Sequence, residues 1–159
     1  MKQSDPVSHW LPCPVVFIST AYEEKSDIMT ATAMFVSEKE PLLAISVAKG
    51  HLTAQLIKKS GAFTLVIASE DQRELVWKLG SIKGDEDDKF ARFAISTLPP
   101  EPGKPLVPVQ ASSWMECTVV SQHPLEGYVL VIARVTNQGN LDNPPLMWHN
   151  RELYTLESL

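Results

Sequence analysis

Short runs of apolar and β-branched residues, separated by clusters of turn-forming residues, constrain the fold of this 159-residue chain more than any other feature. Residues that indicate the start or end of a helix occur only between the apolar runs in the first half of the chain. A doubly wound parallel sheet needs a helix after nearly every strand, so the second half of the chain excludes that architecture. We therefore predict a mainly β fold, an antiparallel barrel with Greek-key links and short inserted helices, as one domain over residues 1–159.

Most of the predicted strands are joined by turns. They cover residues 15–20, 28–36, 42–48, 62–68, 114–121, 128–136, 146–148 and 153–156. The first two strands are expected to form a hairpin, and so are the last two. The proline-rich segment 99–108 is interpreted as a stiff connector within the same domain.

Two short helices are expected among the early strands. The first covers residues 53–60, with Thr53 as its N-cap and Gly61 just after its end. The second follows Ser69 and Gln72, which match a capping box, and ends at Gly80.

Charge and hydropathy exclude several classes of partner. The chain has 14 Lys and Arg against 19 Asp and Glu, a net charge of −5, with no basic cluster that would suit a nucleic acid or an anionic membrane. Its apolar runs fall far short of the roughly 18 residues of a spanning helix. Asp5 and Pro6 interrupt the place where a signal peptide would need an apolar stretch. We expect a cytoplasmic protein with no membrane or nucleic-acid partner.

The usual catalytic and metal-binding motifs are absent. No two glycines stand two apart, so the dinucleotide fingerprint is missing, and so are the Walker loop and the G-x-S-x-G elbow. The four histidines are scattered, and the two cysteines do not form a disulfide scaffold. We predict no side-chain catalytic residue and no metal site.

The segment 46–53 runs from a buried strand into a helix and is a candidate anion site. Unpaired N–H groups at a helix start bind anions, Gly50 allows close approach, and Lys49, His51 and Thr53 offer further donors. The alternative interpretation is a capped helix with two solvated polar residues.

The segment 29–33 is a second candidate, because small and hydroxyl residues occupy the middle of a strand. Thr30 and Thr32 could bond the edge of a flat ligand for which the alanines leave space. The alternative is two threonines on the solvent face of an edge strand.

Taken in order, these segments and several later ones form a pattern that spans about Pro12 to Leu156. The matching stretches are Ile28 to Ser37, Pro41 to Val47, His51 to Phe63, Asp88-Lys89-Phe90, Met115-Glu116-Cys117, and Pro145 to Trp148 with Tyr154. The pattern resembles the flavin reductase-like family of FMN-binding split barrels, which includes flavoredoxins. No single motif is specific, but their order and spacing are.

The resemblance implies a split barrel that forms a homodimer with one FMN per subunit near the interface. Residues 30–32 would meet the isoalloxazine and ribityl groups, and 46–48 would line the flavin. Lys49, His51 and Thr53 would hold the phosphate, and Lys89 would place a cation near the phosphate or ribityl chain. The complete set of implied cofactor-binding residues is Met29, Thr30, Ala31, Thr32, Ser46, Val47, Ala48, Lys49, Gly50, His51, Thr53 and Lys89.

One departure from the family pattern concerns the electron donor. Many family reductases carry Gly-Asp-His before the long late strand, but here Gly127 is followed by Tyr128 and Val129, and His123 is a poor substitute. Three functions follow from the resemblance. The first is an NAD(P)H-dependent reductase of a flavin or another acceptor. The others are a flavoredoxin-like electron carrier or ferric reductase fed by a partner protein, and an FMN binder without turnover.

Overall fold

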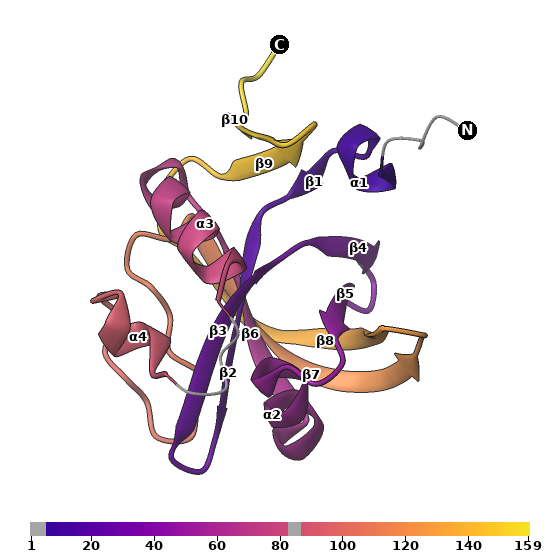
Figure 1. Ribbon diagram of the computed structural model, residues 1–159, viewed down its shortest axis with the longest axis vertical. Helices are drawn as coiled ribbons and strands as arrows, with labels where there is room; N and C mark the ends of the chain where they lie inside the picture. Colours follow the sequence, from indigo (N-terminus) through magenta and orange to yellow (C-terminus); the bar gives the residue numbers. More distant parts are fainter. Residues whose placement is uncertain (1–5, 83–86) are drawn as a thin grey trace.

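A seven-stranded antiparallel sheet dominates the computed structural model, which describes residues 6–82 and 87–159. Its strand order is β3-β2-β6-β7-β8-β5-β4. The strands are β2 (Val16–Tyr22), β3 (Lys25–Ala31), β4 (Ala33–Ser37), β5 (Leu42–Ala48), β6 (Ala62–Ile67), β7 (Ser113–Pro124) and β8 (Tyr128–Asn140). The two edge strands, β3 and β4, are separated in sequence only by Thr32. The sheet therefore has to curl into an open barrel (Figure 1).

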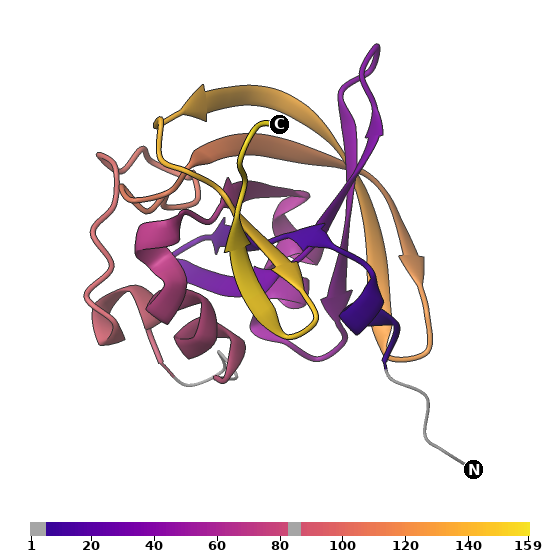
Figure 2. The same ribbon diagram turned by 90° about the horizontal axis from the view of Figure 1, so that it is seen from above.

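A small three-stranded sheet lies at one end of the barrel, seen from above in Figure 2. It has the order β1-β9-β10, with β1 (Cys13–Pro14), β9 (Leu146–His149) and β10 (Glu152–Thr155). The short helix α1 (Val7–Trp10) contacts β9. The tip of the β9–β10 hairpin contains Asn150 and Arg151, both with positive φ.

The remaining helices cover the barrel. Helix α2 (Leu52–Ser60) buries Thr53, Leu56 and Ile57 and lies at the end of the barrel opposite the small sheet (Figure 1). The 3₁₀ turn η1 (Glu70–Gln72) leads into α3 (Arg73–Gly80), and α3 and α4 (Lys89–Arg92) both pack on β3. In the stretches 6–82 and 87–159, no helix has the length and apolar character needed to cross a membrane.

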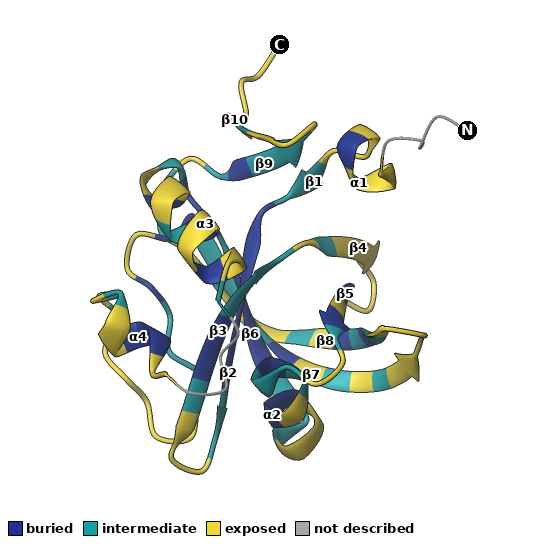
Figure 3. Cartoon of the chain, in the orientation of Figure 1, coloured by how far each residue is buried: buried dark blue, intermediate teal, exposed yellow. Residues whose placement is uncertain are grey.

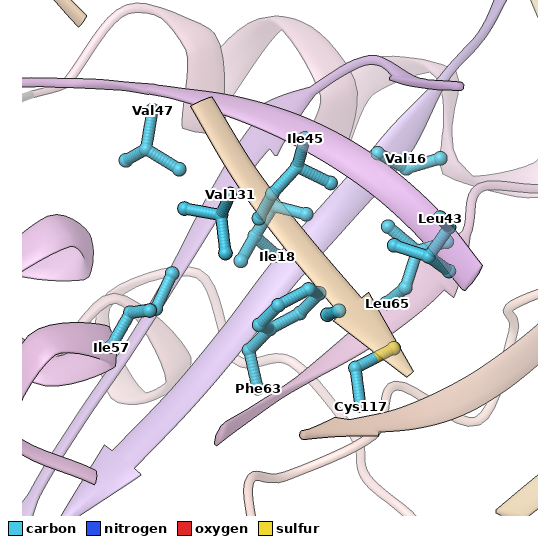
Figure 4. Packing of buried hydrophobic residues seen from close by; sticks show 11 residues of the cluster. Val16, Ile18, Leu43, Ile45, Val47, Ile57, Phe63, Leu65, Cys117 and Val131 are labelled. Atoms are coloured by element: carbon cyan, nitrogen blue, oxygen red, sulfur yellow. The ribbon is translucent and has the colours of Figure 1, made fainter. Parts of the chain in front are cut away.

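Two apolar clusters form the core. One fills the barrel interior with alternate residues of the strands, including Ile18, Ile45, Phe63 and Val131, whose side chains point toward one another in Figure 4. The other lies between the opposite face of β2 and β6 and the helices α3 and α4, around residues such as Phe17 and Val66. Strands β2 and β6 are thus buried on both faces (Figure 3).

The predicted fold class is confirmed, and several details of the prediction are wrong. The expected strand 28–36 is two strands that break at Thr32, because β3 pairs with β2 whereas β4 pairs with β5. The described residues form ten strands, more than the eight expected, and the helices are also more numerous. The N-cap of α2 is His51 instead of Thr53, whereas the capping box of Ser69 and Gln72 is confirmed.

Candidate functional site

Strand β3 presents an unpaired backbone edge beside the barrel. It pairs with β2 on one side only, and the carbonyl of Ile28 points to the other side, where the ammonium of Lys89 donates to it at 2.8 Å. In an antiparallel strand the backbone groups point alternately to the two edges, so those of Thr30 face this edge as well. The Thr30 hydroxyl is bonded to the carbonyl of Val76 in α3 at 2.8 Å, and Thr32 is exposed at the bend. The edge of β3 therefore offers backbone donors and acceptors, with small side chains around them.

The end of β5 reaches the same region from the other side, since β5 and α2 both contact β3. Along β5 the side chains alternate, so Ser46 is exposed whereas Val47 is buried in the barrel. The amide of Lys49 donates to the carbonyl of Gly127 at 3.1 Å, which ties this loop to the β7–β8 turn. Gly50 has a φ of +83°, a conformation that costs other residues energy. The loop turns here into α2.

The start of α2 has the features of an anion site. His51 caps the helix with extended backbone and no side-chain hydrogen bond. Among the described residues, the amides of the first helical turn, Leu52 to Ala54, have no hydrogen-bond acceptor. Such amides, together with the helix dipole, favour a bound anion.

A cavity of about 240 Å³ lies beside this helix start. Val47, Lys49 and Gly50 line it from β5 and the following loop, and α2, β7 and β8 supply the other walls. Lys49 and Lys58 both border the cavity, and no ion pair of the described residues engages either of them. The cavity therefore carries an excess of positive charge. A larger cavity of about 340 Å³, between α3 and residues 93–96, contains none of the predicted site residues.

Thr53 and Lys89 meet at a third residue that the sequence analysis missed. The Thr53 hydroxyl donates to Oδ2 of Asp27 at 2.5 Å, and the Lys89 ammonium lies 2.9 Å from Oδ1 of Asp27. The side chains of Asp27 and Lys89 are each only 2% exposed. A carboxylate at the start of an apolar strand is the one sequence signal that could have pointed to this ion pair.

The structure thus divides the predicted site residues among three neighbouring groups. Residues 29–32 follow β3 to its bend, residues 46–51 form the end of β5 and the loop into α2, and Thr53 and Lys89 converge on Asp27. In this arrangement the polar groups of Thr53 and Lys89 point to Asp27 instead of toward the cavity.

The late turn where the family pattern has a histidine also borders the site. Tyr128 lies opposite Ala48 in the β5–β8 ladder and is 53% exposed. His123 is exposed, and its Nε2 lies 3.0 Å from the hydroxyl oxygen of Ser121. The histidine of the family pattern would be the second residue after Gly127, which here is Val129, opposite Val47 in the same ladder.

The two cysteines are free thiols, of which Cys117 is buried and Cys13 partly buried. Burial raises the pKa of Cys117 to about 12 and also raises the pKa of the half-buried Cys13. The thiol of Cys117 therefore stays protonated at neutral pH, and it faces the barrel core.

Comparisons with known proteins agree with this architecture. The model of the family described as "Flavin reductase like domain" matches residues 7–157. The uncharacterized protein YddH of Escherichia coli (strain K12) is 36% identical over 112 residues, which are 67% of this chain and 59% of that protein. The match therefore spans less than two thirds of that relative's length.

Two solved structures show the fold. The NADH:FAD oxidoreductase SgcE6 of Streptomyces globisporus C-1027 has a TM-score of 0.84 at 15% identity, over 96% of this chain and 90% of that one. A flavoredoxin from Methanosarcina acetivorans has a TM-score of 0.82 at 16% identity, over 100% of this chain and 94% of that one. The chain has the same split-barrel fold as these proteins.

Proposed function

Because the chain belongs to the flavin reductase-like family, we propose that it binds FMN and passes electrons from NADH or NADPH through it to a flavin or another acceptor. The observation that carries this proposal is the meeting of three elements: the unpaired edge of β3, the end of β5 and the start of α2. Together they offer backbone hydrogen bonds for a flat ring and an electropositive helix start for a phosphate.

The residues at this place fit FMN. The ring would lie along residues 29–32 and 46–48, where the side chains are small or turned away and the Thr30 backbone faces outward. The phosphate would be held by the first-turn amides of α2, with Lys49 and His51 as side-chain donors and Gly50 allowing close approach. Thr53 and Lys89 support this arrangement indirectly, through their contacts with Asp27.

The protein's part in the reaction is to bind and orient the cofactor. FMN, when bound, supplies the chemistry of hydride acceptance and electron release. The backbone N–H groups of this site would stabilise negative charge near the ring without a proton transfer, as fixed donors do in other enzymes. The cationic side chains near α2 would neutralise the phosphate in a chain of net charge −5. The proposed reaction needs no side-chain nucleophile or general base.

A flavoredoxin-like electron carrier or ferric reductase, fed by a partner protein, is the second candidate function. The observation that favours it is the segment after Gly127, where Tyr128 and Val129 stand in place of the Asp and His of the family pattern. An FMN binder without turnover is the third candidate. The first two functions differ in the electron donor, the third involves no electron transfer, and all three share the same cofactor site.

We also propose that two copies of the chain form a homodimer through β4. This edge strand carries Met34, Phe35 and Val36, which are 62%, 67% and 41% exposed. Consecutive exposed apolar residues on an unpaired edge are typical of an interaction surface. A cytoplasmic location is part of the proposal, and the two free cysteines agree with a reducing compartment.

The visible spectrum of the purified protein tests the proposal, recorded before and after anaerobic addition of NADH or NADPH. Yellow protein that is bleached by a nucleotide supports the reductase. Yellow protein that dithionite reduces, but neither nucleotide does, favours the carrier or the non-catalytic binder. Colourless protein that also fails to take up added FMN contradicts the proposed cofactor site.

A further inference from the structure

The carboxylate of Asp27 is buried at the point where edge strand β3 passes between α2 and α4. Its two oxygens face different elements: Oδ2 accepts from Thr53 of α2, and Oδ1 lies 2.9 Å from the ammonium of Lys89 in α4. The same ammonium donates to the carbonyl of Ile28 at 2.8 Å. A single side chain therefore connects the first turn of α2, the unpaired edge of β3 and the start of α4.

These contacts occupy the Thr53 hydroxyl and the Lys89 ammonium, which could otherwise bind an anion directly. A threonine hydroxyl has one proton, and that of Thr53 is donated to Asp27. The ammonium of Lys89 is shared between Asp27 and Ile28, and the carboxylate cancels its charge. The amides of the α2 first turn, by contrast, have no acceptor among the described residues.

A gain in stability of the fold is a weak explanation for this ion pair. A buried pair of charges loses the solvation of both ions, and apolar residues of similar volume are often at least as stabilising. The location of the ion pair explains its presence better, since the pair lies between α2 and β3, the two elements that would hold opposite ends of the cofactor.

We propose that Asp27 is a positioning residue of the flavin site. Through Thr53 it holds the first turn of α2 at a fixed place relative to the edge of β3, so that the phosphate and the ring can be bound together. Lys89 neutralises the carboxylate and holds the backbone of Ile28. This inference rests on the proposed function.

The competing explanation is that Thr53 itself contacts the phosphate. A double-mutant cycle separates the two, with the ratio of the affinities for FMN and riboflavin as the readout, because riboflavin lacks the phosphate. Thr53→Val removes the hydroxyl at constant volume. The pair Asp27→Leu and Lys89→Met replaces both buried charges together, which leaves neither one uncompensated.

The expected results differ between the two backgrounds. In the otherwise unchanged protein, Thr53→Val lowers the FMN-to-riboflavin affinity ratio about tenfold, and Thr53→Ser restores it. In the Asp27→Leu/Lys89→Met protein the ratio is already low, and adding Thr53→Val changes it no further. An equal loss in both backgrounds, or no loss in the first, overturns the proposal.

A matched control is Ser19→Ala. Ser19 is also a buried hydroxyl, but it donates to the carbonyl of Leu106 at 2.6 Å and has no bond to α2. This variant is expected to unfold more readily and to keep the affinity ratio. Unchanged protein that binds neither flavin would overturn the proposed function, and this inference with it. A normal FMN-to-riboflavin ratio that Thr53→Val leaves intact would overturn this inference alone.

Discussion

Gly50 shows how one residue sets the geometry of the proposed site. Its φ of +83° turns the chain from β5 into α2, and an added Cβ would meet no atom within 4 Å. The need for glycine is therefore conformational, since space is available. The sequence analysis selected Gly50 for close approach to a ligand, and the structure adds the backbone conformation as a second reason.

The variant Gly50→Ala is expected to lose about 1–2 kcal/mol of unfolding free energy, the cost of a left-handed conformation for a residue with a Cβ. It should also bind FMN more weakly, because the loop before α2 would relax. Gly127→Ala is the control, since Gly127 has no positive φ and its added Cβ also meets nothing. Urea unfolding measures both variants, and equal stability of the two would contradict the prediction.

The buried thiol of Cys117 gives a second prediction for a single residue. Because burial raises its pKa to about 12, its thiolate is almost absent at pH 8, and a disulfide reagent should not modify it in the folded protein. The unfolded protein should react at both cysteines. The Cys13→Ser variant isolates the signal, and rapid reaction of its folded form would contradict the burial of Cys117.

At the scale of elements, tertiary contacts overrule local sequence preference in two places. The residues from Ile28 to Val36 favour one strand, yet the chain breaks at Thr32 because its two halves pair at opposite edges of the sheet. Thr53 suits an N-cap locally, but its hydroxyl is used by Asp27, and His51 takes the cap position without a side-chain bond. The break at Thr32 separates two hairpins of neighbouring strands, whereas the partner of Thr53, Asp27, lies 26 residues away in the sequence.

The pairing of β7 with β8 provides a prediction for an element. Gly139 lies opposite Trp114, and a Cβ added at Gly139 would come within 2.5 Å of the indole ring. Gly139→Ala should therefore displace the indole and cost about 1–3 kcal/mol of unfolding free energy. Tryptophan fluorescence during denaturant unfolding measures both effects. Unchanged stability and an unchanged emission maximum would contradict the prediction.

At the scale of the whole molecule, the open barrel leaves its edge strand β4 uncovered. Phe35 lies opposite Leu43 in the ladder, but it is 67% exposed because the barrel is not closed beyond β4. A protein of this kind can cover such an edge with a second copy of itself.

The variant Phe35→Glu is expected to shift the protein from dimer to monomer, because a charge at the contact would be desolvated without a partner. Light scattering coupled to size-exclusion chromatography measures the mass in solution. Val109→Glu is the control, as Val109 is 38% exposed and lies in the connector before β7. A Phe35→Glu protein with the mass of the unchanged protein would contradict the proposed interface.

The sequence alone determined the class of fold and the segments that form the proposed site. Strand length, turn residues and capping motifs act within a few residues of the chain, so most of the short strands and the helix expected at 53–60, observed at 52–60, could be predicted. The role of region 46–53 as a site stays a prediction. The family resemblance likewise depends on local motifs and their order, and the family is confirmed. The single domain over residues 1–159 stays a prediction.

Only the tertiary structure decided which side chains meet. Thr53 lies 26 residues from Asp27 in the sequence and Lys89 lies 61 residues from Ile28, and no periodicity in the sequence connects them. Their contacts require the barrel to curl until β3, α2 and α4 come together. A buried charge is tolerated only beside an oppositely charged partner. Lys89 reaches Asp27 only in the folded chain, so the role of Asp27 could not be predicted from the sequence.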